Sequence, residues 1–331
     1  MENSVAIVLL TYNRKELLLE CLEAIQKLTV KPDALYIVDN NSNDGTKDLL
    51  YEKKFIPELP KNNINSNQVI NSEISSYTRS DEKIVVRYIN KYKNEGSAGG
   101  FNEGMKMAFN DGYEWIWVMD DDVEPKNNAL EILYKWRKTH SVIQTSREYK
   151  DGSLVHWAGY FIPESGLEYH PDHLQSCLEN SGHVFVSLIC FEGLFINRKI
   201  IEKIGFPDKR FFIAGDDSIY GFLASLYTNI VLIKEKLIIK KIKFEPPIYN
   251  FGIKKLASII PPFWVYYKIR NEFLKMKIMR EQGITIHKEA YKKRIRKIII
   301  LELLFSLYTL DLKRLKSVIT GYIDGKRGWF Y

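Results

Sequence analysis

Hydrophobic and polar residues alternate in blocks over the first third of the chain. Four apolar runs have the length of strands, and three segments between them have helical periodicity. In chain order these segments are 4–10, 14–28, 34–38, 48–53, 84–89, 101–110 and 115–119. Strands that alternate with helices build parallel βαβ units. We therefore expect an α/β fold with a mostly parallel central sheet.

The remaining segments give weaker signals. Residues 57–82 are rich in Asn, Ser and Lys, which predicts an exposed insertion. Further along, strands are expected at 155–162 and 184–190, helices at 198–204 and 218–227, and a loop between Pro246-Pro247 and Pro261-Pro262. From 263 onward the pattern is helical and basic. We expect one α/β domain over 1–245 and a basic helical region over 246–331.

Charge is distributed unevenly along the chain. The net charge is +7, yet residues 268–331 carry 16 Lys+Arg against 6 Asp+Glu, or +10, which leaves −3 for the rest. A basic tail favours an anionic surface. Because no RNP, KH or helix-turn-helix pattern accompanies it, we expect basic amphipathic helices on an anionic membrane surface and no nucleic acid. A solvated helical face remains the alternative.

Targeting and redox signals are few. No apolar run approaches the roughly 18 to 20 residues that span a bilayer, and the first residues do not resemble a signal peptide. We expect a cytoplasmic protein that is peripheral on the inner face of the cell membrane. Cys21, Cys177 and Cys190 lie far apart, without metal-binding spacing, so neither a disulfide framework nor a zinc site is expected.

Three consecutive carboxylates follow the fourth predicted strand. Asp120, Asp121 and Asp122 repel one another at the end of a hydrophobic segment, and a divalent cation removes that cost. Carboxylate oxygens suit Mg²⁺ or Mn²⁺. A solvated acidic turn, or the first turn of a helix before Pro125, is the alternative interpretation.

Two further motifs carry candidate chemistry. Asp216 and Asp217 open a predicted helix, so one carboxylate could cap that helix while the other serves as a general base. Capping alone is the simpler explanation. The glycines of 94–101 precede a helix N-terminus that could bind a phosphate, or they form a tight strand-to-helix turn. This segment matches neither a P-loop nor a dinucleotide-binding GxGxxG motif.

The order and spacing of the motifs resemble one known family. Taken together, 11–13, 38–46, the glycine-rich segment and 119–123 resemble the inverting glycosyltransferases of family 2 over residues 4–235. The resemblance implies a GT-A fold, in which a nucleotide-sugar-binding α/β domain precedes an acceptor-binding part. Residues 94–104 and 321–328 look most like the branch that contains bacterial galactofuranosyltransferases and rhamnosyltransferases.

Residue roles follow from this resemblance position by position. It implies that Asp217 is the catalytic base and that Asp120 and Asp122 hold Mn²⁺ or Mg²⁺. The residues implied in nucleotide binding are Thr11, Tyr12, Asn13, Asp39, Asn41, Gly99, Gly100, Asn102, Asp120 and Asp121, and those implied in acceptor binding are Trp157, Glu192, Gly193, Asp216 and Trp264. Asp39 would accept a hydrogen bond from the base of the nucleotide.

One departure from the family concerns the metal. Relatives commonly carry a metal-ligating His some 20 residues after the base, whereas 234–243 contains none. Water, another carboxylate, or a Lys that replaces part of the metal charge could fill that place.

The implied reaction moves a sugar, such as galactofuranose, rhamnose or another hexose. The donor would be a UDP- or dTDP-sugar and the acceptor a hydroxyl of a glycan or lipid-linked glycan, with inversion, in bacterial cell-surface polysaccharide synthesis. A nucleotidyltransferase, or a non-catalytic membrane- or nucleic-acid-binding module, is the alternative. The sequence leaves open whether the protein is a homo-oligomer.

Overall fold

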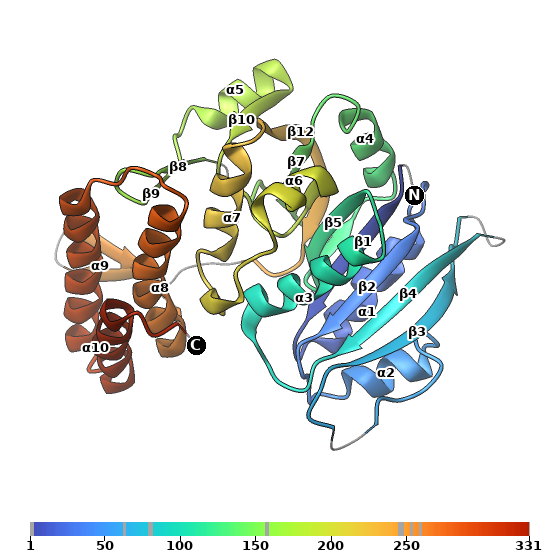
Figure 1. The fold of residues 1–331 in the computed structure, drawn as a ribbon, viewed down its shortest axis with the longest axis horizontal. Helices are drawn as coiled ribbons and strands as arrows, with labels where there is room; N and C mark the ends of the chain where they lie inside the picture. The colour runs from blue at the N-terminus through green and yellow to red at the C-terminus, as the bar shows by residue number, and fades with distance from the viewer. Residues whose placement is uncertain are drawn as a thin grey trace. The chain divides into compact units, whose positions relative to one another are not determined.

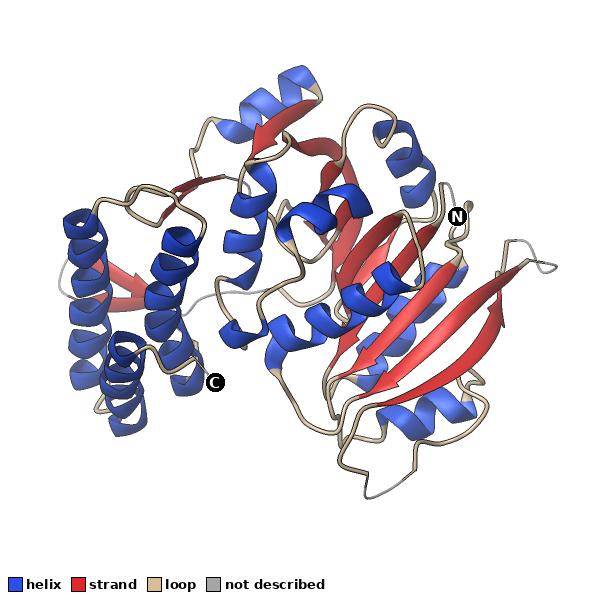
Figure 2. Cartoon of the chain, viewed as in Figure 1, coloured by secondary structure: helices blue, strands red, loops and turns tan. Residues whose placement is uncertain are grey.

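A computed structural model describes most of the chain (Figures 1 and 2). The described residues are 3–61, 64–78, 82–155, 159–243, 248–251, 254–257 and 260–330. Packing divides the chain into two compact units. Unit 1 comprises Met1–Tyr160, His170–Lys209 and Asp217–Ile242, and unit 2 comprises Phe161–Tyr169, Arg210–Asp216 and Lys243–Tyr331. The second unit therefore contains two short earlier segments besides the predicted C-terminal region.

Unit 1 is built on a mixed ten-stranded sheet, as counted over the described residues, with the order β10-β12-β7-β11-β5-β1-β2-β4-β3 and with β6 paired to β12. The strands are β1 Val5–Thr11, β2 Ala34–Asp39, β3 Gln68–Ser75, β4 Lys83–Asn90, β5 Trp115–Asp120, β6 Val123–Pro125, β7 Val142–Tyr149, β10 His183–Val186, β11 Leu194–Asn197 and β12 Ile230–Lys240. The four strands predicted first, β1, β2, β4 and β5, are parallel neighbours. β7 and β12 run in the same direction as these four.

Helices cover both faces of this sheet (Figure 1). The helices of unit 1 are α1 Lys15–Gln26, α2 Thr46–Glu52, α3 Gly96–Asn110, α4 Ala129–Trp136, α5 Leu174–Ser181, α6 Arg198–Ile204 and α7 Asp216–Ser225, whose first residue is assigned to unit 2. In β1, Val5, Ile7 and Leu9 join the core beneath α1, α2 and α4, while the alternate residues join the core on the other face. A strand buried on both faces reads as a continuous apolar run.

Two predicted segments are organised differently in the structure. Residues 68–75, inside the predicted insertion, form the edge strand β3, which pairs antiparallel with β4. Only Ile70 and Ile74 are buried there, so the polar residues between them hid the strand signal. Helix α3 begins at Gly96 instead of at 101, because the glycines expected in a loop belong to its first turns.

The middle of the chain was the least predictable. The predicted strand 155–162 corresponds to β8 Tyr160–Ile162, which pairs with β9 Leu167–Tyr169, while residues 156–158 lie outside the described part. The strand predicted over 184–190 ends at Val186. The predicted helices at 198–204 and 218–227 are present as α6 and α7.

Unit 2 is mainly helical, as predicted. Its helices are α8 Pro262–Glu281, α9 Lys288–Tyr308 and α10 Leu312–Arg327. A small core of Val265, Ile269 and Val318 joins α8 and α10. The loop prediction before α8 was wrong, because β13 Ile248–Phe251 and β14 Lys254–Ala257 form an antiparallel hairpin there. Among the helices in the described residues, none has a stretch long and apolar enough to cross a membrane.

Candidate active site

The three aspartates lie at the carboxyl edge of the parallel strands. Asp120 ends β5, and Asp121 and Asp122 occupy the turn before β6. β1 and β2 end at the same edge, where Thr11 pairs in register with Asp39. The Thr11 hydroxyl donates to Asp121 Oδ2 over 2.7 Å. Ligands of open α/β sheets bind at this edge.

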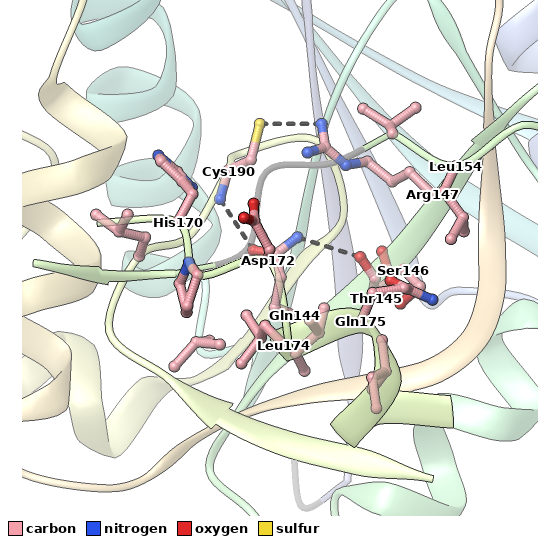
Figure 3. A pocket seen from close by; sticks show the side chains of 16 residues that line it. Gln144, Thr145, Ser146, Arg147, Leu154, His170, Asp172, Leu174, Gln175 and Cys190 are labelled. Atoms are coloured by element: carbon pink, nitrogen blue, oxygen red, sulfur yellow. Dashed lines mark hydrogen bonds between the residues drawn. The ribbon is translucent and has the colours of Figure 1, made fainter. Parts of the chain in front are cut away.

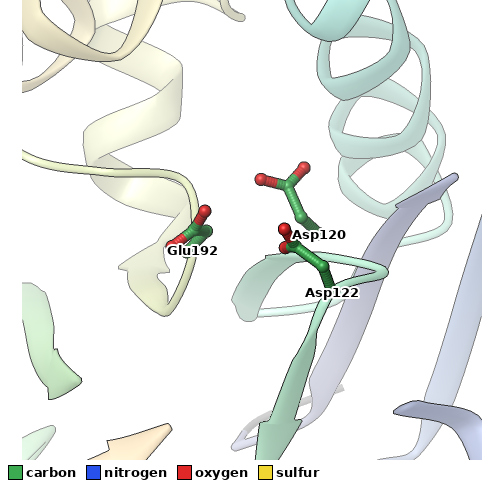
Figure 4. Close-up of side chains that lie close together, drawn as sticks. All are labelled: Asp120, Asp122 and Glu192. Atoms are coloured by element: carbon green, nitrogen blue, oxygen red, sulfur yellow. The ribbon is translucent and has the colours of Figure 1, made fainter. Parts of the chain in front are cut away.

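A fourth carboxylate joins the aspartates. One oxygen each from Asp120, Asp122 and Glu192 lie within 4.8 Å of one another (Figure 4). Glu192 precedes β11, and Gly193 fixes this turn through a φ of 98° and an N–H bond to the Val118 carbonyl of 2.8 Å. Glu192 was predicted on the acceptor side, and the structure brings it into the acidic cluster.

Three cations surround these carboxylates. Lys240, the last residue of β12, hydrogen-bonds to Glu192 and lies 3.4 Å from Asp122 Oδ2. Arg147 of β7 pairs with the other Glu192 oxygen. Arg14 lies 3.2 Å from Asp121 Oδ1 and 3.3 Å from Asp122 Oδ2. Both charge substitutes considered for the missing histidine, a carboxylate and a lysine, are therefore present at the site.

Burial and charge shift the pKa values of these groups in opposite directions. Burial, followed by the Glu192 and Asp122 carboxylates, raises the pKa of Asp120 well above its usual range. Burial raises the pKa of Asp121 to about 6 against the opposing effect of Arg14. The pKa of Glu192 is lowered, because Arg147 and Lys240 outweigh the effect of its burial. Glu192 is thus held as an anion beside carboxylates that resist ionisation.

These residues fit a divalent cation. Asp122 Oδ1 is buried and has no hydrogen-bond partner among the described residues. Such an orphaned carboxylate oxygen is costly unless a positive charge approaches it. Three carboxylates with hard oxygen donors suit Mg²⁺ or Mn²⁺. The arrangement can therefore hold a metal through Asp120, Asp122 and Glu192.

The predicted nucleotide side is formed by the ends of β1 and β2. Asp39 is buried, and its oxygens accept hydrogen bonds from Tyr88 Oη (2.7 Å) and from the Ser42 amide (2.8 Å). The Ser42 side chain adds a further hydrogen bond to this carboxylate, so neighbouring groups hold Asp39 firmly at the end of β2. Tyr12 is exposed on the same edge.

Two asparagines of these loops adopt left-handed backbone conformations. Asn13 has a φ of 53°, and its side chain accepts a bond from the Asn43 amide; Asn41 has a φ of 67°. Asn and Gly tolerate this region better than other residues. The turn chemistry therefore shapes the edge that was predicted to bind the nucleotide.

The predicted glycine-rich loop has a packing explanation. A Cβ on Gly100 would lie 2.2 Å from Leu10 Cδ1, and one on Gly99 would lie 2.4 Å from Glu95 Cβ. Gly100 therefore lets α3 approach β1 closely, whereas Gly99 leaves room for the Glu95 side chain at the start of α3. Asn102 lies one turn further along and donates to the Pro207 carbonyl over 2.8 Å.

Asp217 lies in the first turn of α7. Its Oδ1 accepts a bond from the amide of the next residue, Ser218, over 2.7 Å, whereas an N-cap side chain bonds to the amide two or three residues on. The Asp217 carboxylate is partly exposed. Burial lowers the pKa of Arg147, but Cys190, Glu192 and, to a smaller extent, Asp217 raise it, and the net shift is upward. Asp217 therefore belongs to the same electrostatic neighbourhood as Glu192.

Within unit 2, α8 holds the loop that leads into Asp217. The Asn271 amide donates to the carbonyls of Phe211 (3.0 Å), Ile213 (2.8 Å) and Ala214 (2.9 Å), and Arg270 donates to the same loop. Asp216 ends this loop and is buried. Trp264 is a partly buried residue of α8, and Trp157 lies outside the described residues.

A pocket of about 320 Å³ opens beside the acidic cluster in unit 1 (Figure 3). Its polar wall includes Gln144 and Arg147, and its apolar wall includes Leu174 and Leu188. Cys190 contacts both residues of the polar wall, since its amide donates to Gln144 Oε1 over 3.0 Å and its sulfur lies 3.2 Å from Arg147 Nη1. Arg147 thus lines the pocket and contacts Glu192 at once.

A model of glycosyl transferase family 2 matches residues 6–62 and 65–205, more than half of the chain. The chain belongs to glycosyl transferase family 2. This match covers the sheet edge with the aspartates and Glu192, and it confirms the predicted family.

The chain is similar to two bacterial glycosyltransferases, and it spans less than two thirds of the length of the first. The galactofuranosyltransferase GlfT1 of Mycolicibacterium smegmatis is 26% identical over 221 residues, which span 64% of this chain and 62% of that protein. A GalNAc(5)-diNAcBac-PP-undecaprenol β-1,3-glucosyltransferase of Campylobacter jejuni is 23% identical over 296 residues, 87% of this chain and 78% of that protein.

Solved structures confirm the predicted α/β GT-A fold. The mannosyltransferase PcManGT from Pyrobaculum calidifontis, in complex with GDP-Man and Mn²⁺, has a TM-score of 0.51 at 13% identity, over 98% of this chain and 87% of that one. S. aureus TarS 1-349 in complex with UDP has a TM-score of 0.50 at 12% identity, over 99% and 93%. At such identities the likeness concerns the fold.

Sequence reasoning missed three cationic site residues. Arg14 directly follows the Thr11 motif and could have been found there, and Lys240 lies on the strand where a histidine was sought. Arg147 gives no local signal, because it occurs on a strand that was not predicted and meets Glu192 only in the folded sheet.

Proposed function

We propose that this family 2 protein is a metal-dependent, inverting glycosyltransferase that uses a nucleoside-diphosphate sugar. The observation that carries the proposal is the carboxylate cluster of Asp120, Asp122 and Glu192 at the carboxyl edge of the sheet, with one orphaned Asp122 oxygen. Mn²⁺ or Mg²⁺ would be held by these three residues. The bound cation would offset the negative charge that develops on the departing nucleoside diphosphate.

The nucleotide would lie across the ends of β1 and β2. Thr11, Tyr12 and Asn13 form one side of this edge, and Asp39 the other. Arg14 is 45% exposed in its side chain while it pairs with Asp121 and Asp122, so it can turn toward a diphosphate without losing the whole acidic contact. The UDP and GDP-Man complexes of the structural neighbours support a nucleotide-sugar donor.

Asp217 would act as the general base. Its carboxylate takes the proton of the acceptor hydroxyl while that oxygen bonds to the anomeric carbon. The bond between the anomeric carbon and the diphosphate oxygen breaks, and its electron pair leaves with the nucleoside diphosphate. Attack on the face opposite the leaving group inverts the anomeric configuration.

The pocket beside Glu192 would receive the acceptor. Its wall of Leu174 and Leu188 suits the apolar face of a sugar ring, and Gln144 and Arg147 offer polar groups. The relatives support a glycan or lipid-linked glycan of the bacterial cell surface as acceptor and galactofuranose or another hexose as the transferred sugar.

A donor panel tests this function. UDP-, dTDP- and GDP-sugars are incubated with the protein in Mn²⁺, Mg²⁺ or EDTA, and release of the nucleoside diphosphate is measured with and without glycan acceptors. We expect release from one donor class that requires the cation and is accelerated by an acceptor. No release from any donor under any of these conditions would contradict the proposal.

A variant pair tests the base. Asp217→Asn should lower turnover about 10²- to 10⁴-fold while nucleotide affinity, measured by calorimetry, stays close to wild type. Asp151→Asn changes an exposed turn aspartate that accepts a bond from the Ser153 amide and is the control. Near-normal turnover of Asp217→Asn would remove that residue from the role.

A further inference from the structure

The exposed side of helix α9 has an unusual composition. Exposed residues recur at the three- and four-residue spacing of a single helical face, namely Lys293, Arg296, Lys297, Ile300, Leu301, Leu304, Leu307 and Tyr308. The first three are basic and the last five are apolar. The face therefore changes from cationic to hydrophobic along the helix axis.

The apolar part continues through the turn into α10. Leu310 is 83% exposed and Leu312 is 77% exposed, and Leu307 is 61% exposed. We call the group Ile300, Leu301, Leu304, Leu307, Tyr308, Leu310 and Leu312 the α9 apolar surface. On the helix alone it extends for about 12 Å at 1.5 Å per residue. Contiguous exposed apolar surface of this kind marks an interaction site.

The opposite side of the same turns is buried but partly charged. Glu302 and Ser306 are 6% and 2% exposed. Glu302 accepts bonds from Arg314 Nη2 (2.6 Å) and Lys268 Nζ (3.0 Å), which fixes α9 against its neighbours in unit 2. The end of α9 is thus held by an internal ion-pair network while its leucines face outward. This orientation is built into the packing, because turning the helix would expose the network and break it.

Basic side chains border the apolar surface on both helices. Lys293, Arg296 and Lys297 lie on the same face of α9, and Lys313 and Lys316 are exposed in the first turns of α10. A two-fold interface between copies of this chain at this surface would bring two copies of the basic border close together, which is repulsive. An anionic lipid surface attracts them and also accepts the leucines. The charges therefore favour an anionic bilayer over a second copy of this chain as the partner of the α9 apolar surface.

We propose that the α9 apolar surface inserts into the interfacial region of an anionic phospholipid bilayer, with the bordering lysines and arginine on the headgroups. The leucines enter the boundary between headgroups and acyl chains, and Tyr308 lies at headgroup level. The proposal does not depend on the glycosyltransferase chemistry, because it concerns a surface of unit 2 alone.

Vesicle sedimentation of the full chain tests the proposal. Sucrose-loaded vesicles of phosphatidylcholine, with or without 25% phosphatidylglycerol, are pelleted with the protein at two salt concentrations. We expect binding to the anionic vesicles that weakens with salt, and much weaker binding to the neutral ones. Failure of the wild-type chain to bind anionic vesicles would overturn the proposal.

Three double variants separate the contributions. Leu307→Ser with Leu310→Ser should weaken vesicle binding at least tenfold, because two apolar side chains no longer leave water. Lys293→Gln with Lys297→Gln should weaken binding to anionic vesicles and flatten the salt dependence. The control, Leu59→Ser with Leu226→Ser, removes two exposed leucines of unit 1, which are 43% and 50% exposed, and should bind as wild type.

Folding and self-association are measured alongside. Because the substituted leucines are exposed, circular dichroism melting should be unchanged within about 2 °C. Wild-type affinity of the Leu307/Leu310 variant, or an equal loss in the Leu59/Leu226 control, would overturn the proposal. A wild-type dimer in sedimentation velocity that the Leu307/Leu310 variant abolishes, without vesicle binding, would instead assign the surface to a second copy and would equally overturn it.

Discussion

Replacing Lys240 by methionine should destabilise the protein most strongly when no divalent cation is present. Lys240 lies between Asp122 and Glu192, and the side chains of all three are at most 14% exposed. Methionine keeps the length of the side chain and removes the charge. Among the described residues, the carboxylates then keep Arg14 and Arg147 as cationic partners.

The size of the effect follows from the geometry. Two unit charges 3.4 Å apart, the distance from Lys240 Nζ to Asp122 Oδ2, attract by about 5 kcal/mol at an effective dielectric constant of about 20. Desolvation of the ammonium offsets part of this attraction, and removing one partner of a buried pair costs about 3–5 kcal/mol. Since the two arginines remain, we expect about 3 kcal/mol. In a unit of this size that lowers Tm by about 6–12 °C.

Thermal unfolding in EDTA and in Mn²⁺ provides the assay. A cation bound at one hundred times its Kd stabilises the folded state by about 2.7 kcal/mol. In wild type, part of that gain is lost because the cation competes with Lys240 for the same carboxylates. Mn²⁺ should therefore raise the Tm of Lys240→Met by more than that of wild type.

Two further variants refine the test. Lys234→Met removes a lysine of the same strand whose ion pair with Glu179 is exposed, and it should change Tm by less than about 2 °C. Lys240→His offers an imidazole nitrogen and should raise Mn²⁺ affinity, as measured by calorimetry. If Lys240→Met melts like wild type in EDTA and responds equally to Mn²⁺, Lys240 does not neutralise the cluster, and the electrostatic reasoning is refuted.

Three further outcomes are expected. Asn271→Ala removes three hydrogen bonds to the loop before α7, in which two non-glycine residues have positive φ. Because this loop leads into Asp217, kcat should fall about tenfold with little change in donor KM. A change in KM alone would contradict a positioning role. Gly100→Ala should cost about 1–3 kcal/mol in urea unfolding, because the new Cβ would meet Leu10. Unchanged stability with lost nucleotide affinity would instead favour a phosphate-binding loop. Asp122→Asn should abolish the Mn²⁺-dependent rise in Tm, and a wild-type response would exclude Asp122 as a ligand.

The fold of the first 120 residues was accessible from the sequence. β1, β2 and β5 are buried on both faces, so each reads as an uninterrupted apolar run, and the apolar run of β4 is interrupted only at Arg87. β3 escaped notice because an edge strand buries only alternate residues, here Ile70 and Ile74 among polar ones. β7, β11 and β12 extend the sheet through pairings between distant residues, which no local pattern encodes.

The sequence by itself determined the family, the α/β class and the position of Asp120 to Asp122 at a strand end, because these depend on local order and spacing. Only the tertiary structure decided what surrounds the aspartates. Glu192, Arg147 and Lys240 come from separate strands and loops, and their charges meet only when β11, β7 and β12 pair. The same holds for α9, since its leucines are exposed because the Glu302 to Arg314 pair fixes which side of the helix is buried. Periodicity shows which residues share a face of a helix, but only the packing shows which face is exposed to solvent.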